Sequence, residues 1–183
     1  MPSLVGSVIC IIDRYYPEWS DRGDGPGAPV ASHLPNSPVI QTGKRDGSKI
    51  RLPNGNYLEE TASYYVLVET KAGGMTPALI TMKSTQLNVS KKWNSMMKTI
   101  QIPDGKGGMA IPPMHGVVYN LQSVLQKNDK GSWYGWSVTQ DRIMGQEDKS
   151  LYLTAKDFNS SVSKGNVQTK ADVEEKAKDN TPY

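Results

Sequence analysis

Residues 77–100, PALITMKSTQLNVSKKWNSMMKTI, place a strand pattern directly before a helix pattern. The run 78–82 is apolar and contains a β-branched isoleucine and threonine, which predicts a buried strand. The pair Ser84-Thr85 follows, and a hydroxyl at such a position can cap a helix. Farther along, apolar residues recur at the spacing of a single helix face. They are Val89, Trp93, Met96, Met97 and Ile100. The stretch therefore predicts a strand followed by a packed helix.

The same region carries an excess of positive charge. No Asp or Glu occurs between Thr70 and Pro103, whereas five lysines do. These are Lys71, Lys83, Lys91, Lys92 and Lys98. Because no acid in the segment compensates them, we expect this strand–helix unit to meet an anion.

Length and composition indicate one domain. The chain has 183 residues, 37% of them hydrophobic, and its net charge of +3 does not by itself indicate nucleic acid. No apolar run approaches the roughly 18–20 residues of a membrane span. The N-terminus lacks the basic segment of a signal peptide, so no membrane partner is expected. The single Cys10 lies in the apolar run 8–12 and is interpreted as a buried small hydrophobe, which favours a reducing cytoplasm.

The first half of the chain predicts a strand and then a long loop. The apolar residues of 5–16 predict the first strand, which Pro17 should end because proline has no amide hydrogen for the ladder. Residues 20–48 are rich in Gly, Pro, Ser and Asp and are expected to form a long loop or insertion, with room for a short strand at 39–40.

Further strands are expected on both sides of the helix. Residues 49–58 predict a hairpin that turns at Asn54-Gly55. Alternating apolar residues predict strands elsewhere, and a weaker periodicity predicts a helix near the end of the chain. The strands are 63–70, 77–82, 116–125 and 132–140, with a turn at 127–131, and the helix is 148–164.

This order of elements predicts a mainly β protein. An antiparallel meander with one helix between its third and fourth strands is the arrangement of a five-stranded Greek-key barrel, the OB-fold. We therefore expect an OB-like domain over residues 1–145, with the loop 20–48 inserted in it. A C-terminal helix over 146–164 and a flexible, acidic-tipped tail over 165–183 should follow.

Catalytic motifs are missing from the sequence. Its two histidines, His33 and His115, lie far apart, and no metal-ligand spacing, nucleophile elbow or dinucleotide fingerprint occurs. The glycine-rich run 105–108 is interpreted as a flexible turn because no strand-to-helix context follows it. The acids Asp13, Glu18, Asp21 and Asp24 lie in the first strand and the loop after it, and their spacing matches no nuclease motif. We expect no enzymatic activity, no cofactor and no metal.

Aromatic residues beside basic ones favour binding of single-stranded nucleic acid, which uses a basic groove and stacking platforms. Trp93 is interpreted as a core residue, and Tyr134, Trp136 and Val138 share one strand face that is expected to point to the core. Stacking and packing remain equally open for Trp19 and Trp133, and a plain solvated helix face remains open for the paired lysines. The candidate contact residues are Arg14, Tyr15, Trp19, Arg22, Lys83, Lys91, Lys92, Lys130, Trp133 and Trp136.

The C-terminal residues form a second candidate site. Residues 171–183 contain four acids against two lysines and close with Pro182-Tyr183. Such a segment resembles the tails of single-stranded DNA-binding proteins, although lysines interrupt it here. In that family the tails recruit replication partners and compete with DNA for the basic groove. The resemblance implies a partner-binding role for Asp179, Pro182 and Tyr183.

Residues 5–140 resemble a group of small proteins encoded by tailed bacteriophages, and their arrangement looks like that of phage single-stranded DNA-binding proteins of OB type. The motifs that carry the resemblance are Arg14-Tyr15-Tyr16-x-Glu18-Trp19, Leu52-Pro53-Asn54-Gly55-Asn56, Ser63-Tyr64-Tyr65-Val66-Leu67, Pro77-Ala78-Leu79-Ile80, Ser84-Thr85-Gln86-Leu87, Lys92-Trp93-Asn94-Ser95 and Asn128-Asp129-Lys130-Gly131-Ser132-Trp133-Tyr134-Gly135-Trp136.

The resemblance implies a protein that coats single-stranded DNA without sequence preference during phage replication or recombination. It would act in the cytoplasm of the infected bacterial host and meet replication proteins through its tail. Self-association is compatible with the sequence. The alternative is a virion component or protein-interaction module that does not bind DNA.

Overall fold

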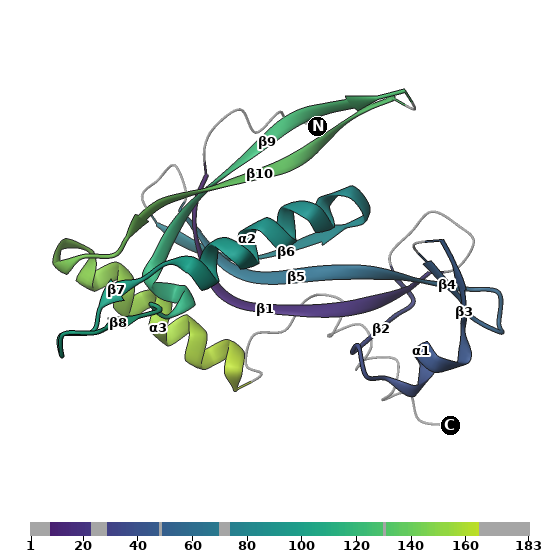
Figure 1. Cartoon of the computed structure of the whole chain (residues 1–183), viewed down its shortest axis with the longest axis horizontal. Coiled ribbons are helices and arrows are strands. Elements are labelled where there is room, and N and C mark those ends of the chain that lie inside the picture. Colours follow the sequence, from purple (N-terminus) through teal and green to yellow (C-terminus); the bar gives the residue numbers. More distant parts are fainter. Residues whose placement is uncertain (1–7, 23–28, 48, 70–73, 130, 165–183) are drawn as a thin grey trace.

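The structure is a computed structural model that describes residues 8–22, 29–47, 49–69, 74–129 and 131–164 (Figure 1). For residues 8–18 it describes the backbone alone. The expected tail over 165–183, including Asp179, Pro182 and Tyr183, lies outside these ranges, as does Lys130.

A large antiparallel sheet dominates the fold, as the mainly β prediction requires. Its strand order is β10-β9-β1-β5-β4-β3, with β2 also beside β1 and β6 also beside β5. A separate two-stranded ribbon joins β7 to β8. The strands are β1 (Val8–Arg22), β2 (Ala31–His33), β3 (Lys44–Asp46), β4 (Lys49–Arg51), β5 (Tyr57–Glu69), β6 (Met75–Lys83), β7 (Ile102–Pro103), β8 (Met109–Ala110), β9 (Val117–Asn128) and β10 (Gly131–Ile143).

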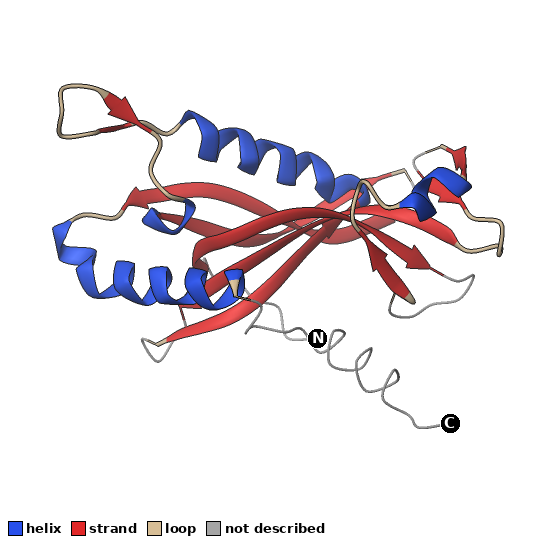
Figure 2. Cartoon of the chain, turned by 90° about the horizontal axis from the view of Figure 1, so that it is seen from below, coloured by secondary structure: helices blue, strands red, loops and turns tan. Residues whose placement is uncertain are grey.

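Two longer helices cover opposite sides of the sheet (Figure 2). They are α2 (Leu87–Thr99) and α3 (Lys149–Ser163). A short helix, α1 (Pro38–Thr42), lies near β3 and β4, and single 3₁₀ turns occupy η1 (Ser84–Gln86), η2 (Met114–Gly116) and η3 (Gln146–Asp148). Among the described residues, no helix is long and apolar enough to cross a membrane.

The main core lies between α2 and the sheet. The indole of Trp93 stacks on the ring of Tyr64, with centroids 4.5 Å apart, and meets the edge of the Tyr119 ring at 5.6 Å. The predicted helix face is confirmed, since all five of its apolar residues belong to this core. Strand alternation is confirmed as well: Tyr64 and Val66 face α2, whereas Leu67 packs with Ala155 of α3 on the other side.

The predicted OB barrel is not what the strand pairing shows. β5 pairs with β1 on one side and with both β4 and β6 on the other, so the sheet branches there. In the part of the chain that the structure describes, β6 and β10 each pair with one neighbour, and the sheet does not close. The helix is found after β6 as expected, but the strands around it form an open sheet. Strand order depends on which edges meet, and local apolar patterns do not determine that.

The predicted end of the first strand at Pro17 is wrong. β1 continues to Arg22, and Pro17 lies opposite Ala62 of β5. The pairing of β1 with β9 ends at Ile11, so at Pro17 the strand has a hydrogen-bonded neighbour on one side only. A proline is tolerated where its missing amide would face an open edge.

The predicted long loop over 20–48 contains regular structure. Its start belongs to β1, and β2, α1 and β3 follow. Residues 39–40 are helical rather than extended, because Pro38 sits in the first turn of α1, where its fixed φ suits a helix start. Val39 and Ile40 pack on a small core of Ile50, Leu52 and Leu58.

The predicted side-chain cap of α2 is also absent from the structure. Ser84 and Thr85 form the turn η1 instead, and no side-chain hydrogen bond caps the start of α2 at Gln86. The other predicted strands, the hairpin at 49–58 and the C-terminal helix are confirmed as elements of the predicted type. Strands β5, β9 and β10 are longer than expected.

Candidate nucleic-acid interface

Positive residues gather on one face of the sheet at the end formed by β3, β4, β5 and β1. Residues directly opposite each other in an antiparallel pair share a face. Lys44 lies opposite Arg51, Arg51 opposite Tyr57, and Tyr57 opposite Arg22. The register therefore aligns these four side chains across four strands.

A second row joins the first on the same face. Asp46 lies opposite Lys49, and Lys49 lies opposite Glu59. One step along, Thr61 of β5 pairs with Lys83 of β6. We call this surface the basic sheet face; it comprises Arg22, Lys44, Asp46, Lys49, Arg51, Tyr57, Glu59 and Lys83.

Glu59 organises the centre of the basic sheet face. Its Oε2 lies 3.3 Å from Nε of Arg22 and 3.6 Å from Nζ of Lys83. The ammonium of Lys49 lies 3.9 Å from the ring centroid of Tyr57, a cation–π contact. These contacts place Arg22, Lys49, Tyr57, Glu59 and Lys83 on the same side of the sheet, as the register indicates.

The charge of this face is unbalanced. Among the residues of this face whose side chains the structure describes, five cations stand against two carboxylates, and Lys44, Lys49 and Arg51 are exposed. Glu18 lies opposite Thr61 in the register and belongs to the part of β1 that is described by its backbone alone. Like charges held on neighbouring strands repel one another, so an anion that lies across them lowers the energy of the face. Tyr57, which is half-buried, adds an aromatic ring within the same surface.

Trp133 lies beside a shallow pocket where β6 meets α2. The pocket holds about 340 Å³ and is lined by Ser84, Thr85, Asn128, Gly131, Ser132 and Trp133. Because Ser84 directly follows Lys83, the basic sheet face leads in sequence to this pocket. In Figure 1, β3, β4, the start of α2 and the tip of the β9–β10 hairpin lie toward the same end of the molecule.

Gln86 joins this hairpin to α2. The backbone N–H of Trp136 donates a hydrogen bond of 2.8 Å to Oε1 of Gln86, and Nε2 of Gln86 donates one of 3.4 Å to Oε1 of Gln126. A Cβ at Gly135 would overlap the same amide of Gln86, so glycine permits the close approach. The side chain of Trp136 packs against the main core.

The structure separates the other predicted contact residues. Trp19 packs on the small core with Val39 and Ile40, on the sheet face opposite Arg22. Lys91 and Lys92 are exposed on α2. Arg14 and Tyr15 lie within β1, where the backbone alone is described.

The arrangement that a metal site requires is a group of ligating side chains close together. The described residues contain no group of three or more His, Cys, Asp and Glu that could hold a metal ion. The glycine-rich run 105–108 forms the turn of the β7–β8 ribbon, where Oδ1 of Asp104 accepts hydrogen bonds from the N–H groups of Lys106 and Gly108. These bonds lower the pKa of the Asp104 carboxyl.

Comparison with protein families gives one match. Residues 5–168 match the model of the family described as Pam3 phage gp34-like protein. The chain belongs to this phage protein family. No curated protein and no solved structure matches it.

Sequence reasoning missed several surface residues of this gp34-like chain. Lys44, Lys49 and Arg51 belong to the run KRDGSKIR, residues 44–51, which has four cations around a single acid and could have been found by counting charges. Tyr134, expected on the core side, is 67% exposed because the hairpin reaches beyond the main core. Tyr134 is close in sequence to the turn at 127–131, and this position near a hairpin turn could have indicated its exposure.

Proposed function

We propose that this gp34-like chain binds single-stranded DNA without sequence preference and acts in phage DNA replication or recombination. The observation that carries the proposal is the basic sheet face, where five cations stand against two acids among the residues whose side chains the structure describes. The pocket of Trp133 begins at Ser84, the residue after Lys83. Cations in a row match a phosphate backbone, and aromatic rings beside them offer platforms for bases.

The exposed lysines and arginine on β3 and β4 would hold phosphates. Such contacts release counterions from the nucleic acid, so the affinity should fall steeply with salt. In this proposal they contact phosphates and not base edges, so binding would not depend on sequence. Lys91 and Lys92 of α2 extend the set of candidate phosphate contacts.

Trp133 and Tyr134 would hold bases. Trp133 is partly exposed beside its pocket, and Tyr134 is the more exposed of the two. Stacking of a base on an aromatic side chain contributes about 1–3 kcal/mol by alanine substitution. In this proposal the protein has no catalytic role, and its site of action is the cytoplasm of the infected host.

The test is a titration with oligo-dT followed by tryptophan fluorescence at several salt concentrations. We expect quenching at low salt and an affinity that falls linearly with salt on logarithmic axes. The double variant Lys49→Gln/Arg51→Gln should bind more weakly and with a shallower salt slope. Its matched control is Lys149→Gln/Lys164→Gln, which removes two charges at the ends of α3, away from the basic sheet face (Figure 1).

Two results would overturn the proposal. One is unchanged fluorescence and unchanged gel mobility with oligo-dT at low salt. The other is an equal loss of affinity in both double variants, which would trace binding to net charge rather than to this face. Running the assay without residues 171–183 tests whether the C-terminal segment competes with DNA.

A protein-interaction or virion role is the second candidate, and the β9–β10 hairpin favours it. Leu125 and Tyr134 lie opposite each other in the register and are 63% and 67% exposed. Paired exposed apolar side chains are typical of a contact surface. Mass spectrometry of purified particles discriminates, because a DNA-coating protein should not be stoichiometric in virions.

A further inference from the structure

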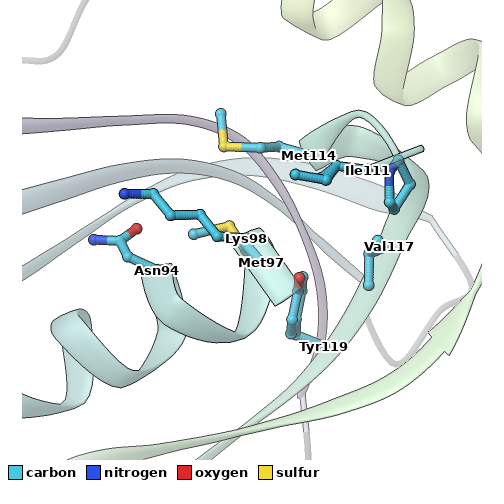
Figure 3. A pocket seen from close by; sticks show the side chains of 8 residues that line it. Asn94, Met97, Lys98, Ile111, Met114, Val117 and Tyr119 are labelled. Atoms are coloured by element: carbon cyan, nitrogen blue, oxygen red, sulfur yellow. The ribbon is translucent and has the colours of Figure 1, made fainter. Parts of the chain in front are cut away.

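A second pocket lies at the C-terminal end of α2. Figure 1 shows that this end of the helix lies away from β3 and β4. It holds about 340 Å³, which is the size of a small ligand site. The last turns of α2, the segment before β9 and the first residues of β9 line it. Figure 3 shows these side chains around the pocket: Asn94, Met97, Lys98, Ile111, Pro112, Met114, Val117 and Tyr119.

The lining is apolar on most sides and polar on one. Met97, Val117 and Tyr119 are buried and form the inner wall, whereas Ile111 is 59% exposed and lies at the mouth. Asn94 and Lys98 are one helical turn apart on α2 and extend along the same side of the pocket (Figure 3). An apolar ligand body would fit the wall, and its polar group would meet this side.

The polar side favours a negative group. Lys98 makes no ion pair with any described residue, and α2 itself contains no Asp or Glu. The Asn94 amide supplies a second hydrogen-bond donor at the same place. A cation beside an apolar wall pairs with an anion more strongly than it would in open water.

We infer that this pocket binds a small amphipathic organic anion, with a compact apolar body against Met97, Val117 and Tyr119 and a carboxylate or sulfonate at Lys98. The site is independent of the basic sheet face, so it adds a second ligand to the proposed DNA-binding role. Lys98 also lies in the last turn of α2, where a cation stabilises the helix end in any case. The experiment must therefore separate ligand binding from helix stability.

The probes are 8-anilinonaphthalene-1-sulfonate and N-phenyl-1-naphthylamine, which share a ring skeleton and differ in charge. We expect the full chain to bind the anionic dye at one site. Lys98→Gln should weaken this binding by about tenfold, the scale of one charge-assisted hydrogen bond. The neutral dye should change less than about twofold. Lys91→Gln, the same charge change elsewhere on α2, should alter neither affinity.

Two further experiments test whether the dye binds in this pocket and which class of ligand the pocket prefers. Ile111→Asp, which puts a carboxylate at the pocket mouth, should weaken the anionic dye more than the neutral one. Octanoate should displace the anionic dye at lower concentration than octan-1-ol does, and oligo-dT should not displace it. Thermal unfolding of each variant shows that the chain remains folded.

The inference is overturned if the anionic dye does not bind at one site. It is also overturned if Lys98→Gln weakens both dyes equally, or if Lys91→Gln has the same effect as Lys98→Gln. Displacement of the dye by oligo-dT would assign the anion site to nucleic acid and remove the second ligand. Loss of oligo-dT binding in the proposed-function assay would leave the pocket untouched, so the two proposals fail separately.

Discussion

Arg22 of β1 and Glu59 of β5 form an ion pair, with Nε and Oε2 3.3 Å apart. The same carboxylate oxygen lies 3.6 Å from the ammonium of Lys83. One acid therefore partly neutralises two candidate phosphate contacts. Removing its charge should leave both cations more available to an anion.

Glu59→Gln is expected to raise the affinity for oligo-dT by about twofold to tenfold at low salt, since surface charge pairs contribute about 0.2–1 kcal/mol each. The matched control is Glu60→Gln, which makes the same charge change on the opposite face of β5, where Glu60 pairs with Trp19. Fluorescence titration at fixed salt measures both. Equal gains in the two variants would mean that overall charge, and not the Glu59 contacts, sets the affinity.

Trp93 should be the side chain on which stability depends most. It is fully buried, stacks on Tyr64 and contacts Tyr119. Trp93→Ala is expected to lower the free energy of unfolding by about 3–5 kcal/mol, the usual cost of emptying a large aromatic site. Trp133→Ala, which removes a partly exposed ring, should cost less than about 1.5 kcal/mol. Urea unfolding measures both, and similar losses would contradict the core assignment.

The hydroxyl of Tyr64 bonds to Ser90 of α2, with the two side-chain oxygens 2.6 Å apart. Tyr64→Phe keeps the stack with Trp93 but leaves Ser90 without this buried partner. We expect a loss of about 1–3 kcal/mol in the free energy of unfolding. Tyr152→Phe, on a partly exposed residue of α3, is the control and should cost little. An unchanged urea midpoint for Tyr64→Phe would show that the hydrogen bond does not stabilise the fold.

Local patterns predicted the strands and helices that bury one face. Two such patterns are the alternation of Tyr64, Val66 and Leu67 and the helix face that contains Trp93. Each depends on residues that are close in sequence, and these residues determine which side of a single strand or helix is buried. The open sheet was not predictable in this way. It follows from β5 sharing one edge between β4 and β6, a choice made by segments distant in sequence.

In the candidate site, too, some features follow from local sequence and others depend on how distant strands pair. The absence of acids between Thr70 and Pro103 made Lys83 look uncompensated, yet Glu59 reaches it from the adjacent strand β5. The cluster at Lys44, Lys49 and Arg51 was visible as a run of charges, but its alignment with Arg22 needs the strand register. Tyr134 had the spacing of a core residue, and only the length of the hairpin beyond the core leaves it exposed.

The turn between β10 and α3 should make stability depend on pH in acid. Asp148 is buried, and its Oδ1 accepts a hydrogen bond of 3.0 Å from Nη2 of Arg142. Its Oδ2 accepts one of 3.1 Å from the N–H of Gly145. The Arg142 guanidinium, and then the Gly145 amide, lower the pKa of the Asp148 carboxyl in the folded chain.

A carboxyl whose pKa is lower in the folded than in the unfolded chain contributes stability above the unfolded pKa, which is about 3.9 for aspartate. That contribution is lost as the pH falls through the lowered, folded pKa. Asp148→Asn should therefore be less stable than the parent chain at pH 7, and the difference should shrink below about pH 4. Urea midpoints between pH 2 and pH 7 measure it. The control is Asp157→Asn, which makes the same charge change at an exposed position on α3. A difference between Asp148→Asn and the parent that stays constant down to pH 2 would assign the loss to packing and not to the carboxylate charge.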